Sequence, residues 1–292
     1  MRRQRSSIDL TSVCEWQDAR VRRFLDYLAR EEPLEIRVGN HPLCVTMRTP
    51  GHDLELATGF LVTEGLIQRR DQIADLRQGI DEKGQELGNV VQIELAGVEI
   101  DRARMQRNFF ATSSCGICGK ASIEAVRVRG IGCPNQSLRV DAEVLYGLPD
   151  KLRAAQTIFG RTGGLHAAGI FDTSGELIAL REDVGRHNAV DKVVGWALLQ
   201  GRLPLAHHLL MVSGRGGFEI VQKALVAGFP LLACVSAPSS LAVQSARQLG
   251  LTLVGFLRGK RFLVYAGEER ILQDVEPSIS SPGKSKEILS FQ

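Results

Sequence analysis

The sequence predicts an α/β protein: a three-layer α/β/α domain with a mixed sheet, preceded by a smaller N-terminal α+β region. From about residue 150 to 268, segments with helical spacing of apolar residues alternate with short apolar runs. This alternation requires crossover connections, which give a largely parallel sheet with helices on both faces. Before residue 100, apolar and polar residues alternate at period two, which predicts the strands of the N-terminal region.

Composition sets the broad class of the protein. The chain has 292 residues, of which 44% are hydrophobic and 24% charged, enough for one large or two modest cores. A net charge of +3 is too weak for a nucleic-acid footprint. The N-terminus lacks the apolar segment of a signal peptide, no apolar run approaches the roughly 18 residues of a membrane span, and the six cysteines are too sparse for a disulfide scaffold. We therefore expect a cytoplasmic protein without nucleic-acid or membrane partners.

The N-terminal part divides into an arm and an α+β region. Residues 1–30 are polar and predict an arm or a surface helix, and residues 31–149 form the α+β region. Segments 35–38 and 43–47 predict a β-hairpin. Asp53 is expected to cap a helix that ends near Gly65. Residues 90–95 are the clearest member of a second strand pair.

The second half, residues 150–268, is expected to fold as one domain, followed by a tail at 269–292. The tail contains Pro277, Pro282, Gly283 and several serines, which predicts disorder. The expected helices are 150–160, 190–198, 218–227 and 239–249, and the expected strands are 165–171, 177–180, 209–212, 231–235, 251–254 and 262–265.

Cys115 and Cys118 lie in a loop rich in glycine and serine, residues 113–120. Lys120 follows closely, and a helix can begin at residue 121. Exposure, positive charge and a helix N-terminus all favour the thiolate, which is the reactive form of cysteine. The pair is therefore a candidate for chemistry.

Four uses of this pair compete. A structural zinc site needs about four ligands, and no second group of ligands is present, so no metal is expected. A thioredoxin-like pair would follow a strand in a small βαβ unit, whereas this pair lies in the middle of the chain after an irregular loop. Packing of the two cysteines as small hydrophobic residues is disfavoured by the flanking glycines. In a sulfur relay, Cys115 attacks a donor persulfide and Cys118 is its partner or resolving thiol. The spacing alone does not decide among redox chemistry, packing and relay.

Three turns of the second half can receive anions. Arg186 and His187 follow one predicted strand, and Gly214 and Arg215 follow another, where free N–H groups of the next helix point at a ligand. The third turn, residues 256–261, carries three cations. Each turn alone has an ordinary structural explanation, and His166 and His187 can be hydrogen-bonded structural residues. Together the turns predict a clamp on phosphates.

Several motifs occur in the order of a known family. They are Thr49-Pro50-Gly51-His52-Asp53, Ser114-Cys115-Gly116-Ile117-Cys118-Gly119, Thr162-Gly163-Gly164-Leu165-His166, Arg181-Glu182-Asp183-Val184-Gly185-Arg186-His187-Asn188, Ser213-Gly214-Arg215 and Ser236-Ala237-Pro238-Ser239-Ser240. Over about residues 31–267 the chain resembles the formate dehydrogenase accessory sulfurtransferase family, known as FdhD.

The resemblance implies a cytidine-deaminase-like fold, although the zinc motif of deaminases is absent. It implies a sulfurtransferase that takes sulfur from a cysteine desulfurase and passes it to Mo-bis(molybdopterin guanine dinucleotide), the bound substrate, for maturation of the formate dehydrogenase catalytic subunit. Cys115 would carry the persulfide with Cys118 assisting, and a homodimer is the family expectation. Alternatives are a cofactor chaperone without sulfur transfer and a dithiol oxidoreductase.

The same resemblance assigns a segment that binds the guanine-nucleotide part of the cofactor. That segment is Phe256, Leu257, Arg258, Gly259, Lys260 and Arg261. The residues themselves offer further candidates, which are His166 and, from the two other turns, Arg186, His187, Gly214 and Arg215.

Overall fold

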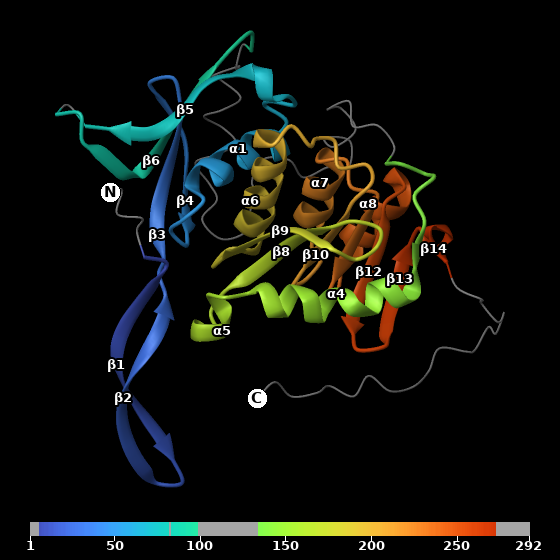
Figure 1. The fold of residues 1–292 in the computed structure, drawn as a ribbon, viewed down its shortest axis with the longest axis horizontal. Helices are drawn as coiled ribbons and strands as arrows, with labels where there is room; N and C mark the ends of the chain where they lie inside the picture. The colour runs from blue at the N-terminus through green and yellow to red at the C-terminus, as the bar shows by residue number, and fades with distance from the viewer. Residues whose placement is uncertain (1–5, 82, 99–133, 273–292) are drawn as a thin grey trace.

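The structure, a computed structural model, describes residues 6–81, 83–98 and 134–272 (Figure 1). The predicted loop at 113–120, with Cys115 and Cys118, lies outside the described residues. None of the described helices is long and apolar enough to cross a membrane.

A six-stranded mixed sheet forms the centre of the molecule. A mixed sheet was predicted, but the expectation that it is largely parallel is wrong, because three of its five strand pairings are antiparallel. Its strand order is β13-β12-β11-β10-β8-β9. Strands β10, β11 and β12 run parallel to one another, whereas β8, β9 and β13 pair antiparallel with their neighbours. The strands are β8 (His166–Phe171), β9 (Leu177–Asp183), β10 (Leu209–Val212), β11 (Leu231–Cys234), β12 (Thr252–Arg258) and β13 (Arg261–Ala266).

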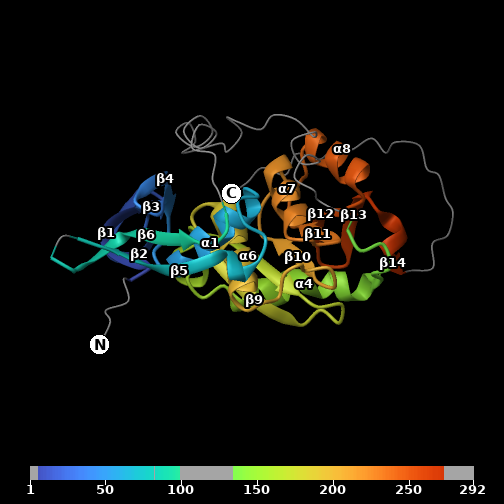
Figure 2. The same cartoon turned by 90° about the horizontal axis from the view of Figure 1, so that it is seen from above.

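Helices cover both faces of this sheet (Figure 2). Leu210 and Val212 of β10 pack into the core that contains α6 (Arg186–Leu199), α7 (Phe218–Val226) and α8 (Ser240–Leu249). Leu209 and Met211 point to the other face, against α4 (Ala142–Ala155). Strands buried on both faces read as continuous apolar runs, which is why the sequence revealed them. The particular likeness to the cytidine-deaminase fold stays a prediction.

The N-terminal region contains the four-stranded sheet β4-β3-β6-β5 and helix α1 (Asp53–Thr63). The predicted hairpin is confirmed as β3 (Glu32–Val38) and β4 (His41–Arg48), and the second strand pair as β5 (Ile73–Ile80) and β6 (Glu86–Leu95). The predicted capping by Asp53 is wrong. His52 occupies the cap position, and both Asp53 oxygens accept 2.9 Å hydrogen bonds from buried Arg48.

Helix α1 packs directly on α6, through a glycine on each helix. A side chain on Gly59 would overlap the Asp191 carbonyl, and one on Gly195 would overlap the Glu55 carbonyl. The two helix backbones are therefore in direct contact at these glycines. One hydrophobic core joins Leu34 and Val91 of the N-terminal region to Val193 and Leu210 of the second.

Two predicted boundaries differ from the structure. Helix α4 begins at Ala142 and contains Pro149, so the boundary predicted between 149 and 150 falls inside a helix. The tail predicted from residue 269 is wrong at its start, because Arg270 is fully buried and donates to the Asn135 carbonyl (3.1 Å) and the Thr252 hydroxyl (3.0 Å). Strand β14 (Ile271–Leu272) then pairs with β7 (Val140–Asp141). Residues 273–292 lie outside the described part.

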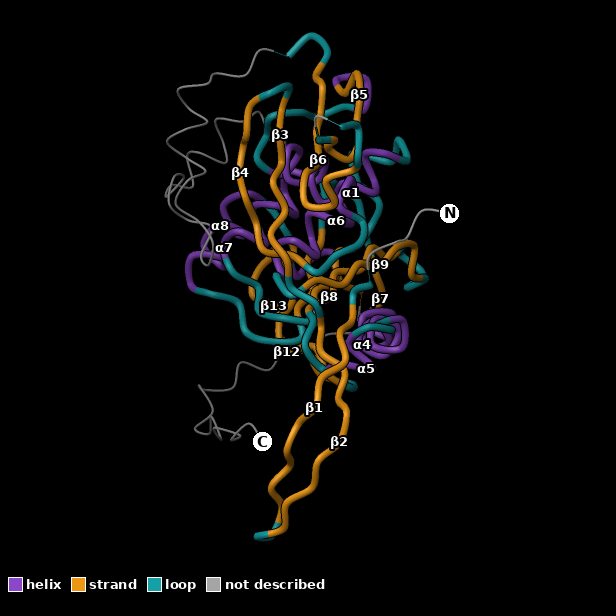
Figure 3. The backbone as a smooth tube through the Cα atoms, turned by 90° about the vertical axis from the view of Figure 1, so that its left-hand side faces the viewer, coloured by secondary structure: helices purple, strands orange, loops and turns teal. Residues whose placement is uncertain are grey.

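The N-terminal arm is a long β-hairpin and not a surface helix. Strands β1 (Ile8–Gln17) and β2 (Arg20–Ala29) pair along their whole length and project from the body (Figures 1 and 3). Asp18 and Ala19 both adopt positive φ, 48° and 60°, as the tight turn between antiparallel strands requires.

Candidate functional site

One edge of the central sheet gathers most of the predicted site residues. His166 begins β8 and lies opposite Asp183 at the end of β9, while β10, β11 and β12 end at the same edge because β8 runs antiparallel to β10. We call this region the cationic edge. It comprises His166 and the loops 184–187, 213–217, 236–240 and 256–261.

Backbone hydrogen bonds tie neighbouring loops of the cationic edge together. The Ser236 amide donates to the Gly214 carbonyl (3.4 Å), and the Gly216 amide donates to the Ala237 carbonyl (3.2 Å). The Phe256 amide donates to the Ser236 carbonyl (3.3 Å). Loops that are far apart in the sequence therefore form one continuous surface above the strand ends.

His166, Gly214 and Arg186 meet at the first of these loops. A Cβ on Gly214 would stand 3.3 Å from His166 Nδ1, which is a tight contact, and 4.0 Å from Arg186 Cδ, which is an ordinary one. Burial lowers the pKa of His166, and the nearby positive charges of Arg186, His187 and Arg215 lower it further. The imidazole is therefore neutral at neutral pH and is surrounded by cationic groups.

Glu219 is a member of this group that the sequence analysis did not select. Its Oε2 lies 2.8 Å from His187 Nε2, and its side chain is only 13% exposed. Within the described residues, Glu219 Oε1 and Arg186 Nε are buried without a hydrogen-bond partner. The sequence feature that could have identified Glu219 is its position two residues after Gly217, in the first turn of α7.

Helix N-termini add donors to the same edge. Helices α6 and α7 start at Arg186 and Phe218 with no side-chain cap, whereas Ser239 caps α8 by accepting from the Ala242 amide (3.2 Å). Uncapped amides and the helix dipole favour a negatively charged group. The cationic edge can therefore bind anions through backbone and side chains together.

The turn at 256–261 joins β12 to β13 and lies at the opposite end of the cationic edge from His166. Phe256 is 37% exposed and adopts φ 52°, an uncommon conformation for a residue with a side chain. Arg258, Lys260 and Arg261 are exposed, and Arg258 Nε donates to the Val235 carbonyl at 3.4 Å. Leu257 is fully buried in the core that contains α4, so its side chain is not available to a ligand.

A buried polar network fixes the loop that carries Arg186. Asp183 accepts from Lys192 (2.7 Å) and from the amides of Thr49 (3.1 Å) and Gly185 (2.8 Å). Asn188 donates to the same carboxylate at 3.0 Å. Because Thr49 belongs to the N-terminal region, this network joins that region to the cationic edge and holds the loop in one position.

The described cysteines do not offer a reactive thiol near the edge. Burial raises the pKa of Cys44 and of Cys234 to about 12, so both remain protonated. Cys14 is exposed on the distant hairpin. The described residues hold no metal-binding group of three His, Cys, Asp or Glu, but Cys115 and Cys118 lie outside them, so the absence of a metal stays a prediction.

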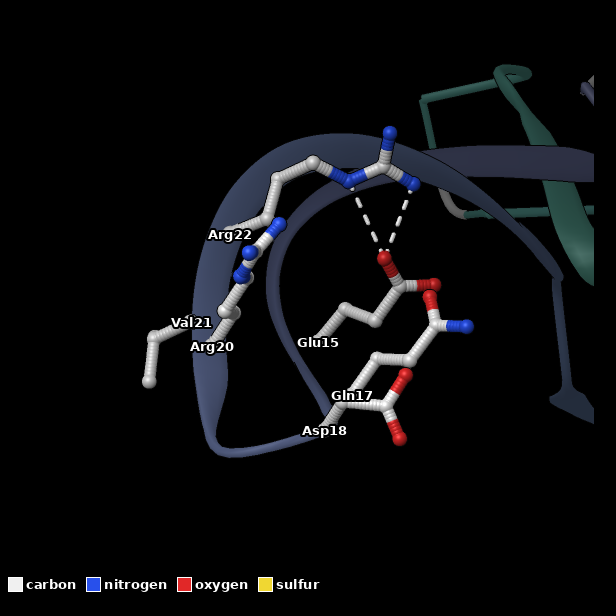
Figure 4. Close-up of a pocket in the computed structure, with 6 residues that line it drawn as sticks. All are labelled: Glu15, Gln17, Asp18, Arg20, Val21 and Arg22. Atoms are coloured by element: carbon white, nitrogen blue, oxygen red, sulfur yellow. Dashed lines mark hydrogen bonds and ion pairs between the residues drawn. The ribbon is translucent and has the colours of Figure 1, made fainter.

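A separate hollow lies at the tip of the N-terminal hairpin (Figure 4). The hollow is formed by β1 and β2 alone, and an ion pair joins Glu15 of β1 to Arg22 of β2 at 2.8 Å. None of its lining residues belongs to the cationic edge. They are Glu15, Gln17, Asp18, Arg20, Val21 and Arg22.

The fold and the cationic edge define a mixed α/β protein with an anion-receptive site at the ends of its strands. The chain belongs to the FdhD/NarQ family, whose sequence profile matches residues 29–272. It is 54% identical over 251 residues to the sulfur carrier protein FdhD of Streptomyces avermitilis, covering 84% of this chain and 89% of that protein.

More distant relatives carry the same name. The sulfur carrier protein FdhD of Saccharolobus solfataricus is 42% identical over 252 residues, covering 84% of this chain and 91% of that protein. A crystal structure from Desulfotalea psychrophila, described as a formate dehydrogenase accessory protein, superposes with a TM-score of 0.72 at 22% identity. It covers 91% of this chain and 100% of that chain, and it supports the fold alone.

Proposed function

We propose that this protein is a sulfurtransferase that carries sulfur on Cys115. It would accept persulfide sulfur from a cysteine desulfurase and transfer it to the molybdenum cofactor Mo-bis(molybdopterin guanine dinucleotide), for the maturation of formate dehydrogenase. The observation that carries the proposal is the family match over residues 29–272, which includes Cys115 and Cys118. The relatives that share this match are named sulfur carriers.

Loading would be a thiol exchange at sulfur. The Cys115 thiolate attacks the terminal sulfur of the donor persulfide, the new S–S bond forms at Cys115, and the donor cysteine leaves as a thiolate. No external oxidant or reductant is needed, because one thiolate is consumed and one is released. Cys118 would assist as a neighbouring or resolving thiol.

The cationic edge supplies groups that suit the guanine-nucleotide part of the substrate. Arg258, Lys260 and Arg261 can neutralise phosphates, and the uncapped N-termini of α6 and α7 provide amide donors. The exposed ring of Phe256 offers a surface on which a base can stack. Gly259, at φ 51°, permits the turn, whereas Leu257 contributes to the core.

The setting of this activity follows from its chemistry. Free thiols persist in a reducing compartment, so a carrier that must present a free Cys115 thiol suits a cytoplasmic location. The partners of the proposed reaction are the cysteine desulfurase and the formate dehydrogenase catalytic subunit. A homodimer is also part of the proposal, as the family resemblance implies.

Intact-protein mass spectrometry after incubation with a cysteine desulfurase and cysteine tests the carrier directly. The wild type should gain the mass of sulfur, and Cys115→Ala should not. Cys14→Ala is the matched control, because Cys14 is an exposed cysteine on the distant hairpin, and it should load like the wild type. Equal loading of Cys115→Ala would overturn the assignment.

Activation of formate dehydrogenase separates the alternatives. Full activation by the Cys115→Ala/Cys118→Ala double variant would indicate a cofactor chaperone without sulfur transfer. A reversible Cys115–Cys118 disulfide with turnover of model disulfides would indicate a dithiol oxidoreductase. The carrier proposal predicts neither result.

A further inference from the structure

Glu219 brings a negative charge to the cationic edge. The four loops of the edge contain arginine and lysine but no aspartate or glutamate, and Glu219 follows the loop 213–217 in the first turn of α7. Asp183 precedes the loop 184–187, but its carboxylate is paired with Lys192 at 2.7 Å and is fully buried. Glu219 is therefore the acidic group that reduces the positive charge of the edge.

The carboxylate of Glu219 joins the first turns of two helices. His187 and Glu219 are the second residues of α6 and α7, and 2.8 Å separates His187 Nε2 from Glu219 Oε2. Lys223, one turn further along α7, is already held by Asp191 at 2.8 Å. Among the residues that the structure describes, His187 is thus the group that pairs with Glu219. The pair lies where uncapped helix amides favour an anion.

This arrangement leaves polar atoms unsatisfied. Within the described residues, Glu219 Oε1 and Arg186 Nε are both buried without a hydrogen-bond partner. A buried polar atom without a partner is costly, and such atoms in a folded site call for an explanation. A rearrangement that gives Arg186 an anionic partner would remove part of this cost.

We propose that Glu219 is an internal anion of the cationic edge, which occupies His187 in the free protein and which a phosphate of the ligand displaces. Phosphate oxygens would then accept from Arg186 and from the uncapped amides of α6. The identity of the ligand, a guanine nucleotide of the cofactor, rests on the proposed function. The new element is that Glu219 lowers the affinity of the edge for anions.

The electrostatics of the site give this effect its sign. A bound phosphate and the Glu219 carboxylate would share the N-terminal turns of α6 and α7, and like charges repel most where little water screens them. The Glu219 side chain is only 13% exposed. Differences in affinity at one site arise mainly from the dissociation rate, so Glu219 would speed the release of a cofactor that has to be handed on.

Calorimetric titration with GDP and with inorganic pyrophosphate, at fixed pH and ionic strength, tests the proposal. Glu219→Gln keeps an oxygen that can accept from His187 but carries no charge, and it should bind both probes at least about tenfold more tightly. Glu219→Asp keeps the charge and should stay within about threefold of the wild type. Glu143→Gln is the matched control, because it removes an exposed carboxylate from the first turn of α4, outside the cationic edge, and should leave both affinities unchanged.

Four results would overturn the proposal. Weaker GDP binding by Glu219→Gln would show that Glu219 accepts a hydrogen bond from the ligand, and a gain for GDP without one for pyrophosphate would place its effect at the base. A gain of the same size in Glu219→Asp would assign the effect to shape instead of charge. Unchanged or undetectable binding of both probes in Glu219→Gln would place the anion elsewhere.

Sulfur loading keeps this test separate from that of the proposed function. All Glu219 variants should accept sulfur from a cysteine desulfurase as the wild type does, which also verifies that they are folded. If the wild type failed to load, the proposed sulfurtransferase would be contradicted, whereas the anion affinities would still decide the role of Glu219.

Discussion

His166 is a neutral group in a cationic environment, and a bound anion would change its protonation. A phosphate placed at the edge stabilises the imidazolium, so the pKa of His166, lowered in the free protein, would rise on binding. Proton uptake then accompanies binding. Affinity for an anion is therefore expected to increase as the pH falls through the ordinary range of histidine.

Calorimetric titration with GDP between about pH 5.5 and 8 measures this effect. The affinity of the wild type should increase severalfold on acidification, and His166→Gln should reduce that increase. Arg186, Arg215, His187 and Asp183 are the other charged or titratable groups that act on His166. His41→Gln, on the exposed β3–β4 turn, is the control and should behave like the wild type. An identical pH profile for His166→Gln would contradict this role.

Glu55 makes the stability of the protein depend on pH. Burial opposes its ionisation, but hydrogen bonds from Arg181 (2.7 Å) and an interaction with His52 (3.1 Å) outweigh burial and hold the pKa of Glu55 below its usual range. A lowered carboxyl pKa contributes stability that is present above the unfolded-state pKa, about 4.3, and is lost as the pH falls through the folded-state value.

Urea unfolding at neutral and acid pH tests this contribution. Glu55→Gln should lower the free energy of unfolding by about 1–3 kcal/mol near pH 7, because a neutral side chain no longer pairs with Arg181. The loss should become progressively smaller as the pH falls below about 4.3 and through the lowered folded-state pKa. The exposed Glu268→Gln serves as control and should change little. An equal loss at both pH values would show that the charge of Glu55 is not responsible.

At the scale of elements, the contact of α1 with α6 depends on two glycines. A methyl group on Gly195 would overlap the Glu55 carbonyl, so Gly195→Ala must push the helices apart. We expect a loss of at least about 3 kcal/mol in thermal or urea unfolding. Gly147→Ala is the control, because Gly147 of α4 has nothing within 4 Å of a Cβ and alanine favours helix by about 1 kcal/mol. Equal effects of the two substitutions would contradict the close packing.

Physical reasons explain which helices and strands could be predicted from the sequence and which could not. The strands of the central sheet were predicted because burial on both faces leaves continuous apolar runs such as Leu209–Val212. Helix α4 was predicted to begin after Pro149, yet Leu145, Leu148 and Leu152 all pack on the sheet, and this packing outweighs the hydrogen bond that proline removes. The N-terminal hairpin was missed because its turn, Asp18-Ala19, has no glycine.

The site was predicted in parts, but not its assembly. Glycine and arginine after predicted strands indicated Gly214, Arg215 and Arg186 individually. Their meeting with His166 depends on β8 running antiparallel to β10, a strand order that no local pattern encodes. Leu257 was assigned to the ligand through the family resemblance. Its burial depends on the irregularity of β12 between Gly255 and Arg258, where Phe256 adopts positive φ and Leu257 packs in the same core as Val254.

At the scale of the whole molecule, one core joins the N-terminal region to the central sheet. Leu34 and Val91 share it with Val193 and Leu210, and the Asp183–Lys192 network reaches Thr49 across the same junction. We therefore expect one cooperative thermal transition, with equal calorimetric and van't Hoff enthalpies. Two separate transitions in differential scanning calorimetry would instead support independent domains divided near residue 149.

The proposed function requires that the Cys115 carrier deliver its sulfur to a cofactor held at the cationic edge. The most direct measurement is single-turnover transfer of isotopically labelled sulfur from the loaded protein to the molybdenum cofactor. The wild type should pass its label to the cofactor, whereas Arg258→Ala/Arg261→Ala should load normally and transfer at least about tenfold more slowly, because two exposed cations of the edge are lost. Transfer at the wild-type rate by that variant would contradict a role of these two cations in holding the acceptor.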